Sequence, residues 1–125
     1  RDIAAEFLPK LESQLASYRI KYHGDEVATR TLKDASAATE ESWSTEYLGP
    51  EMSVRVVENV QAAIDHINQY GSHHTDSIIS NDYQAVECFL NGVDSSAVMV
   101  NASTRFNDGG QFGFGAEIGI STDKF

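Results

Sequence analysis

The residues with the clearest capacity for chemistry lie in the last quarter of the chain, directly after an apolar run. Residues 97–100 read Ala-Val-Met-Val, and Asn101, Ser103, Thr104 and Arg105 follow them. A short apolar run bounded by turn signals is typical of a buried strand, and open α/β sheets bind ligands at the carboxyl ends of their strands. A guanidinium matches carboxylate or phosphate geometry and keeps its charge, so this segment predicts a site for a small anion.

A glycine-rich tail follows this polar segment. Its members are Gly109, Gly110, Gly113, Gly115 and Gly119. Glycine lets the backbone come close to a ligand, which fits the predicted anion site. The spacing of the last three weakly resembles a nucleotide loop. However, no strand-to-helix turn of the required kind precedes them, so a dinucleotide fingerprint is not predicted.

A second candidate is the segment 46–50, which reads Glu-Tyr-Leu-Gly-Pro. The Gly-Pro pair favours a turn, and the apolar pair before it must pack on a neighbouring element. The carboxylate of Glu46 beside this turn can accept two hydroxyls of a ribose. From these residues alone, the segment indicates only a turn.

The remaining reactive residue types have structural interpretations. Neighbouring residues of an extended chain point to opposite sides, so His73 and His74, with Asp76 close by, predict hydrogen bonding and no metal site. His66 is expected to be solvated on a helix. Cys88 lies mid-helix without a cation or helix N-terminus to lower its pKa, which predicts a buried or half-buried filler and no nucleophile.

Hydrophobic spacing and capping residues predict the elements that position these candidates. Expected helices, with Asp2, Asn59 and Asp82 as N-caps of three of them, cover 2–18, 25–32, 60–70 and 83–92. Expected strands cover 20–22, 54–57, 77–80 and 97–100, and 33–45 is an exposed connection. Strands alternating with helices from residue 54 onward predict parallel pairing, so the fold class is α/β, a three-layer domain with a mostly parallel sheet flanked by helices.

Length and composition limit the number of domains and the classes of partner that the protein can have. The 125 residues suit one domain with one core, and the formal net charge is −10. This charge argues against nucleic acid and anionic membrane surfaces as partners, and no apolar run has the roughly 20 residues that span a bilayer. A single cysteine indicates a reducing compartment, so we expect a cytoplasmic protein. Both ends look cut, and we expect one domain of a longer polypeptide.

Four stretches together resemble a known family. They span 70–79, 93–98, 101–109 and 112–122, and the string Asn-Ala-Ser-Thr-Arg-Phe at 101–106 is the most specific of them. The sequence is similar to the gamma-glutamyl phosphate reductases of the aldehyde dehydrogenase superfamily, densely so over 54–122. The resemblance implies a fold like the aldehyde dehydrogenase catalytic domain.

The resemblance also implies a reaction. Members of the family reduce L-glutamyl 5-phosphate with NADPH, giving glutamate 5-semialdehyde and phosphate in proline biosynthesis. A cysteine thiolate attacks the acyl phosphate and the thioester is then reduced. That cysteine is expected upstream of Arg1, and Cys88 does not match its position. The chain is therefore expected to be a partial catalytic domain, residues 1–125, without the nucleophile segment, the cofactor domain or a C-terminal continuation, and inactive alone.

The resemblance assigns two groups of site residues. Segment 46–50 is similar to the superfamily's Glu-Ile-Phe-Gly-Pro, which places Glu46 and Leu48 on the cofactor side, although an aliphatic Leu48 cannot stack as an aromatic side chain does. The loop at 101–106 matches the substrate side and assigns Asn101, Ser103, Thr104 and Arg105 to a small-molecule substrate. Whether Arg105 meets a carboxylate or a phosphate stays open. The complete protein is expected to be a homo-oligomer.

Two other classes of function remain open on the sequence. A non-enzymatic α/β module that binds a small anionic ligand would explain the missing nucleophile without truncation. An assembly interface would explain apolar surface on an isolated domain.

Overall fold

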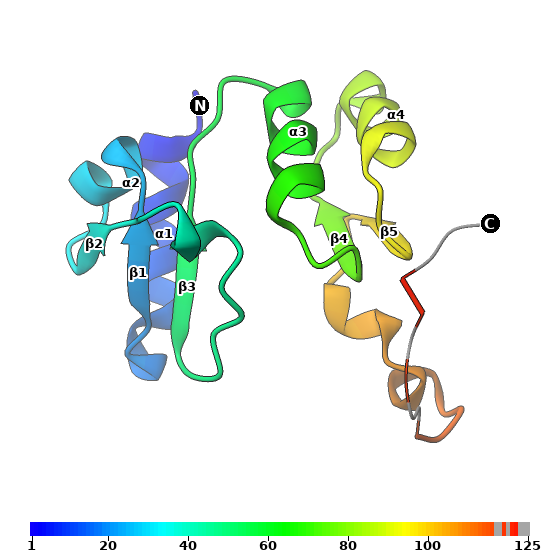
Figure 1. The fold of residues 1–125 in the computed structure, drawn as a ribbon. Helices are drawn as coiled ribbons and strands as arrows, with labels where there is room; N and C mark the ends of the chain where they lie inside the picture. Colours follow the sequence, from blue (N-terminus) through cyan, green and yellow to red (C-terminus); the bar gives the residue numbers. More distant parts are fainter. Residues whose placement is uncertain (117–118, 120, 123–125) are drawn as a thin grey trace. The chain divides into compact units, whose positions relative to one another are not determined.

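The computed structural model describes residues 1–116, 119, 121 and 122. The chain divides into two compact units, Arg1–Glu58 and Asn59–Phe125 (Figure 1). Each unit has its own cluster of buried apolar side chains. The prediction of one core for the whole chain is therefore wrong. No helix in the described part of the chain is long and apolar enough to cross a membrane.

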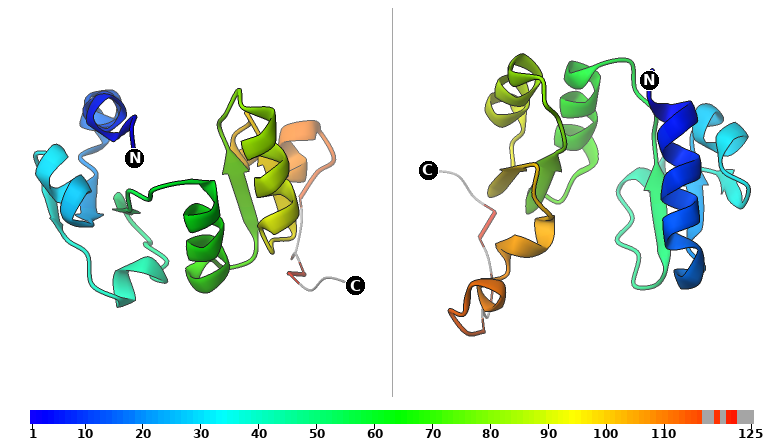
Figure 2. Two further views of the ribbon diagram at one scale, coloured as in Figure 1. Left: turned by 90° about the horizontal axis from the view of Figure 1, so that it is seen from above. Right: turned by 180° about the vertical axis from the view of Figure 1, so that it is seen from behind.

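The first unit contains a parallel sheet with helices against it. Its elements are α1 (Ala4–Leu15), η1 (Ala16–Tyr18), β1 (Lys21–Gly24), α2 (Glu26–Thr31), β2 (Ala35–Ala37), η2 (Glu41–Trp43) and β3 (Glu51–Val54). The strand order is β2-β1-β3, and both pairings are parallel. The view from behind in Figure 2 shows α1 lying across one side of this sheet.

Side-chain alternation along the strands gives the sheet an apolar and a polar face. Tyr22 and Met52 are register partners and both belong to the apolar cluster that packs under the helices. The buried members of this cluster are Ala4, Leu8, Tyr22, Ala28 and Leu32. On the opposite face His23 lies in register with Ser36 of β2 and Ser53 of β3. This polar face matters for the candidate site described below.

The sequence predicted the first helix but not how it is oriented or capped. Their helical spacing predicts that Ile3, Phe7, Leu8 and Tyr18 share the buried face. Leu8 is buried, whereas Ile3, Phe7 and Tyr18 remain 69%, 50% and 67% exposed. The N-cap position is occupied by Ile3 without a side-chain hydrogen bond, so the predicted cap at Asp2 is wrong. The expected exposed connection at 33–45 contains the short strand β2 and the turn η2.

Asp25 joins the start of α2 to the chain that leaves β3. Its Oδ1 accepts a hydrogen bond from the Ala28 N–H at 2.8 Å, which caps the helix. Its Oδ2 accepts one from the Val56 N–H at 2.9 Å. One carboxylate therefore satisfies two backbone donors from segments far apart in sequence.

Asp25→Ala is expected to destabilise the fold by about 2–3 kcal/mol, since both donors lose a charged acceptor. Asp25→Asn keeps one oxygen for the cap and replaces the other with an NH₂, so about half of this loss is expected. Denaturant midpoints of the two variants check this order. Equal midpoints for Asp25→Asn and the unmodified protein would contradict the role of the Val56 contact.

The second unit contains a smaller parallel sheet. Its elements are α3 (Val60–Tyr70), β4 (Thr75–Ile78), α4 (Tyr83–Gly92), β5 (Ala97–Val100), η3 (Thr104–Asn107) and η4 (Gly109–Phe112). Strands β4 and β5 pair in parallel with Asp76 opposite Val98 and Ile78 opposite Val100. In Figure 1 the helices α3 and α4 lie above these strands and η3 (orange) lies below them.

Local capping explains where the two helices begin. Asn59 accepts a hydrogen bond from the Ala62 N–H, and Asp82 accepts from the N–H groups of Gln84 and Ala85, as the sequence predicted. Ile64 of α3, Phe89 of α4 and Val93 after α4 form the buried cluster of this unit, and they are 2%, 3% and 3% exposed. This cluster covers one face of the β4–β5 pair.

The α/β class is confirmed, with parallel sheets flanked by helices. The predicted parallel pairing of the last two strands is also confirmed. The expected strand at 54–57 ends at Val54 and pairs with β1, so among the described residues it does not continue the β4–β5 sheet. The expected strand at 77–80 begins two residues earlier, at Thr75.

Candidate functional site

The predicted anion-binding residues gather at the start of η3. Ser103 is the N-cap of this turn, and its Oγ accepts a hydrogen bond from the Arg105 N–H at 3.2 Å. Ser103, Thr104 and Arg105 are all exposed. Residues with two hydroxyls and one guanidinium are thus exposed at neighbouring positions on the surface of the second unit.

Arg105 forms an ion pair with Asp108, and its side chain remains largely exposed to solvent. Its Nη1 lies 2.7 Å from Oδ2 of Asp108, and its side chain remains 67% exposed. An ion pair this exposed stabilises the fold by at most about 1 kcal/mol. Because a guanidinium carries several N–H donors in a fixed fork, its other donors can bind a carboxylate or a phosphate.

Asp108 also caps the turn η4 in addition to pairing with Arg105. Its Oδ1 accepts a hydrogen bond from the Gly110 N–H at 2.9 Å and caps η4. After η4 the chain uses the predicted glycines, since Gly113 and Gly115 adopt φ values of +79° and +86°. These are left-handed conformations in which a side chain is strained. Of the resembling tail, residues 117, 118 and 120 lie outside the described residues.

The side-chain amide of Asn101 forms hydrogen bonds with the backbone of Ser80. Its Oδ1 accepts a hydrogen bond from the Ser80 N–H at 2.9 Å, and its Nδ2 donates to the Ser80 carbonyl at 3.0 Å. Its φ of +52° lies in the left-handed region, which asparagine tolerates better than most residues. The amide therefore ties the residue after β5 to the residues after β4.

The segment after β5 folds back across the sheet. Ser77 donates from Oγ to the Ala102 carbonyl at 2.7 Å, and Asn107 donates from Nδ2 to Oγ1 of Thr75 at 2.7 Å. Thr75 and Ser77 are two residues apart on β4 and share one face. Residues 102–107 therefore run along the face of β4 opposite the helices, so the candidate site does not extend outward from the strand ends as the sequence suggested.

The second predicted group lies in the first unit, in the segment between η2 and β3. Glu46 is exposed and Leu48 is 96% exposed. Tyr47 between them is half-buried, and its ring stacks on His23 with centroids 5.1 Å apart and an interplanar angle of 2°. The segment thus turns one side chain inward and presents the two predicted cofactor contacts to solvent.

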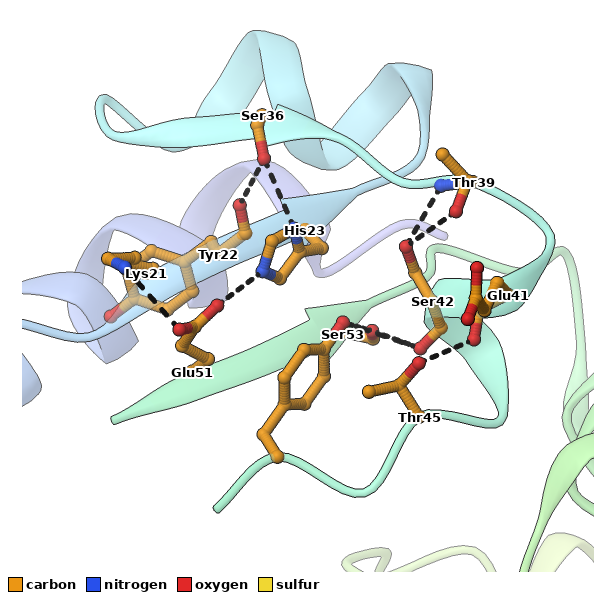
Figure 3. Close-up of polar contacts among 11 residues, drawn as sticks. Lys21, Tyr22, His23, Ser36, Thr39, Glu41, Ser42, Thr45, Glu51 and Ser53 are labelled. Atoms are coloured by element: carbon orange, nitrogen blue, oxygen red, sulfur yellow. Dashed lines mark hydrogen bonds and ion pairs between the residues drawn. The ribbon is translucent and has the colours of Figure 1, made fainter. Parts of the chain in front are cut away.

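His23 belongs to a hydrogen-bonded group on the polar face of the sheet (Figure 3). Its Nε2 lies 2.9 Å from Oε2 of Glu51 and its Nδ1 lies 3.2 Å from Oγ of Ser36. Hydrogen bonds from His23 and from Lys21 hold the pKa of the Glu51 carboxyl below its usual value.

Sequence reasoning missed this group because it misplaced both strands that carry it. The strand expected at 20–22 reaches Gly24, and the strand expected at 54–57 runs from Glu51 to Val54. With the correct register, Lys21 faces Glu51 and His23 faces Ser53. A polar residue at every second position of 21–23 and 51–53 was the signal that could have revealed it.

The other reactive residues have structural contacts. His73 Nδ1 lies 2.5 Å from the Asp94 carbonyl, and Asp76 accepts a hydrogen bond from the buried Ser95 hydroxyl at 2.5 Å. His66 is half-buried against Tyr70, so the expectation that it is solvated needs correction. Over the described residues, no group of three or more His, Cys, Asp or Glu side chains could hold a metal.

Cys88 is half-buried on α4, as predicted. It packs against the cluster formed by Ile64, Phe89 and Val93. Its Sγ lies 3.9 Å from Oε1 of Gln61. Its position fits a packing role.

A cavity of about 660 Å³ opens beside α1 in the first unit. Tyr22 lines it, and burial, together with the nearby Glu12 and Asp34, raises the pKa of this phenol. The other lining residues are Pro9, Ser13, Leu15, Ala16, Arg19, Ile20, Lys21 and Lys33. None of the predicted site residues contributes to this cavity.

The profile of the aldehyde dehydrogenase family matches residues 7–117. The chain belongs to the aldehyde dehydrogenase family. This family uses a nicotinamide cofactor and acts on small-molecule substrates. Of residues 46–48, Glu46 presents a carboxylate and Leu48 an apolar side chain to solvent.

Individual members of the family give closer likenesses. The chain is 54% identical over its whole length to the gamma-glutamyl phosphate reductase of Rhodopirellula baltica and 51% identical over 99% of its length to that of Listeria innocua. It spans 29% and 30% of those proteins. The crystal structure of the Thermotoga maritima gamma-glutamyl phosphate reductase superposes with a TM-score of 0.91 at 46% identity, covering all of this chain and 30% of the other. The resemblance stated from the sequence is confirmed.

A more distant structure shares the fold. The gamma-glutamyl phosphate reductase of Saccharomyces cerevisiae superposes with a TM-score of 0.65 at 24% identity, covering 95% of this chain and 33% of the other. At this identity the likeness concerns the arrangement of helices and strands alone. It agrees with the α/β class derived from the sheet pairings.

Proposed function

We propose that the complete protein carrying this chain reduces L-glutamyl 5-phosphate with NADPH to glutamate 5-semialdehyde and phosphate, a step of proline biosynthesis. The observation that carries the proposal is the exposed guanidinium of Arg105 in a turn that also carries the exposed residues Ser103 and Thr104. A doubly acidic substrate needs such a group. The identity of 54% over the whole chain to a reductase of this name supports the choice of substrate.

Each group of residues has a distinct role in this proposal. Arg105, with Ser103 and Thr104, binds the anionic end of the substrate, and Asn101 fixes the loop that carries them through its two bonds to Ser80. Glu46 accepts hydroxyls of the nicotinamide ribose. NADPH supplies the hydride when it is bound.

Leu48 takes the cofactor-side position that an aromatic residue has in the wider superfamily. An aliphatic side chain covers a ring by apolar contact and cannot add the directional stacking of an aromatic. At 96% exposure this leucine is free to make such a contact. We propose that it packs beside the nicotinamide and keeps water from that side.

We also propose that residues 1–125 form part of a catalytic domain whose nucleophilic cysteine lies outside them. Cys88 is half-buried in a packed cluster, which supports this placement. The 125 residues alone are then inactive. The complete protein is also proposed to be cytoplasmic and a homo-oligomer.

A chimera tests the proposed function directly. These residues replace the matching segment of the Rhodopirellula baltica reductase, to which they are 54% identical. Because acyl phosphates hydrolyse in water, the assay follows the reverse reaction, the phosphate-dependent reduction of NADP⁺ by glutamate 5-semialdehyde. We expect kcat/KM within about tenfold of the parent enzyme, a difference of about 1.4 kcal/mol.

The parent enzyme is the control for this experiment. A chimera with the circular dichroism and melting temperature of the parent but without phosphate-dependent activity would contradict the proposal. Anion binding by that inactive chimera would instead favour a non-enzymatic module.

A further inference from the structure

Tyr47 is the one residue of segment 46–48 that turns toward the sheet. It is half-buried, whereas Glu46 and Leu48 on either side of it are exposed. Glu46 and Leu48 are bonded to Tyr47 through the backbone, so the way in which Tyr47 is held limits where these two side chains are presented.

The ring of Tyr47 rests on a histidine that is itself fixed. The two rings are nearly parallel, with an interplanar angle of 2° and centroids 5.1 Å apart. This geometry is typical of favourable aromatic stacking when the rings are offset. Glu51 and Ser36 contact the two ring nitrogens of His23 at 2.9 Å and 3.2 Å, which fixes the plane of the imidazole (Figure 3).

The hydroxyl of Tyr47 is held as well. It lies 3.1 Å from Oγ of Ser53 on β3 and 3.5 Å from the Ser42 carbonyl. Ser53 also donates to the Ser42 carbonyl at 2.7 Å, which ties η2 to the same face of the sheet (Figure 3). Tyr47 is thus restrained by its ring and by its hydroxyl, from two neighbouring strands.

We propose that Tyr47 is a positioning residue for the cofactor side of the site, and that His23 holds the Tyr47 ring by stacking against it. This inference rests on the proposed function, in which Glu46 and Leu48 contact the nicotinamide end of NADPH. The rigid sheet fixes His23, His23 and Ser53 fix Tyr47, and Tyr47 fixes the two residues beside it.

The test measures NADPH binding to the chimera by fluorescence titration and compares it with steady-state constants. Tyr47→Ala frees the segment, so we expect the Kd for NADPH and the KM for NADP⁺ to rise about tenfold, while the KM for phosphate and for the semialdehyde stay within about twofold. Tyr47→Phe keeps the stacked ring and is expected to restore most of the affinity. His23→Ala removes the imidazole on which the Tyr47 ring stacks. We expect its Kd for NADPH to lie between those of Tyr47→Ala and Tyr47→Phe.

Tyr18→Ala is the matched control, since this tyrosine is 67% exposed in the same unit and is expected to leave every constant unchanged. An unchanged NADPH Kd in Tyr47→Ala, or an equal rise of all KM values, would overturn the inference. Glu46→Gln and Leu48→Ala separate it from the proposed function. If these two raise the Kd and Tyr47→Ala does not, only the positioning role fails. If none of the three changes the Kd, the cofactor assignment fails with it.

Discussion

Arg105→Ala in the chimera is expected to lower kcat/KM about 100-fold. The substitution removes charge-assisted hydrogen bonds to an anion, worth about 3 kcal/mol together. The reverse assay also shows which anion Arg105 meets, because phosphate and the semialdehyde are added separately. A rise in the KM for phosphate assigns the guanidinium to the phosphoryl group, and a rise in the KM for the semialdehyde assigns it to the carboxylate.

Two further variants control for charge and for the neighbouring carboxylate. Arg105→Lys keeps the charge but loses the planar fork, so it is expected to recover only part of the lost activity. Asp108→Asn removes the partner that lies 2.7 Å from Nη1 and is expected to cost far less activity than Arg105→Ala. Melting temperatures of all three should match that of the chimera, since the ion pair is exposed. A near-normal kcat/KM for Arg105→Ala would remove this residue from the site.

Phe89→Ala is expected to be the most destabilising substitution proposed, at about 3–5 kcal/mol. The side chain is 3% exposed and lies in the cluster with Ile64 and Val93 under α3 and α4. Its removal leaves a cavity that the surrounding helices and strands fill only in part. Native-state hydrogen exchange of the amides in α4 and β5 measures the loss within this unit.

Leu90→Ala is the matched control, one residue further along the same helix. Leu90 is 43% exposed, so its truncation is expected to cost less than about 1 kcal/mol. The spacing of the apolar residues at 86, 89 and 90 predicts that both side chains face inward. The structure corrects this prediction for Leu90. Equal losses of exchange protection in the two variants would show that the cluster does not hold α4 in place.

The features that sequence reasoning predicted well are those fixed by neighbouring residues. Asn59 and Asp82 were expected to cap α3 and α4, and both accept the backbone hydrogen bonds that a cap requires. An N-cap depends only on the residue itself and the first turn after it. The observed bounds of α3, Val60–Tyr70, also match the expected range 60–70.

Strand bounds and pairings were predicted less well because they depend on partners distant in sequence. The three residues of β2 carry no apolar pattern, and they become a strand only because β1 lies beside them. Likewise, Glu51 and Ser53 look like loop residues until Lys21 and His23 are found opposite them. A register error of a few residues was enough to hide the group around His23.

The assignment of Ser103, Thr104 and Arg105 to a substrate stays a prediction. The structure places these three exposed residues at the start of η3. The sequence could not show that residues 102–107 return along β4, because this path is set by single hydrogen bonds from Ser77 and Asn107. The sequence also could not show that the side-chain amide of Asn101 makes two hydrogen bonds with the backbone of Ser80.

These same bonds have a thermodynamic consequence for ligand capture. Asn101 secures the loop on one side of Arg105 and Asn107 secures it on the other, so the backbone between them is already ordered without a ligand. Binding of the anion that Arg105 contacts, whether phosphate or the semialdehyde carboxylate, should then carry little entropic penalty from ordering the loop. Calorimetry on the chimera should show a more unfavourable binding entropy for Asn107→Ala, in which one of the two restraints is gone.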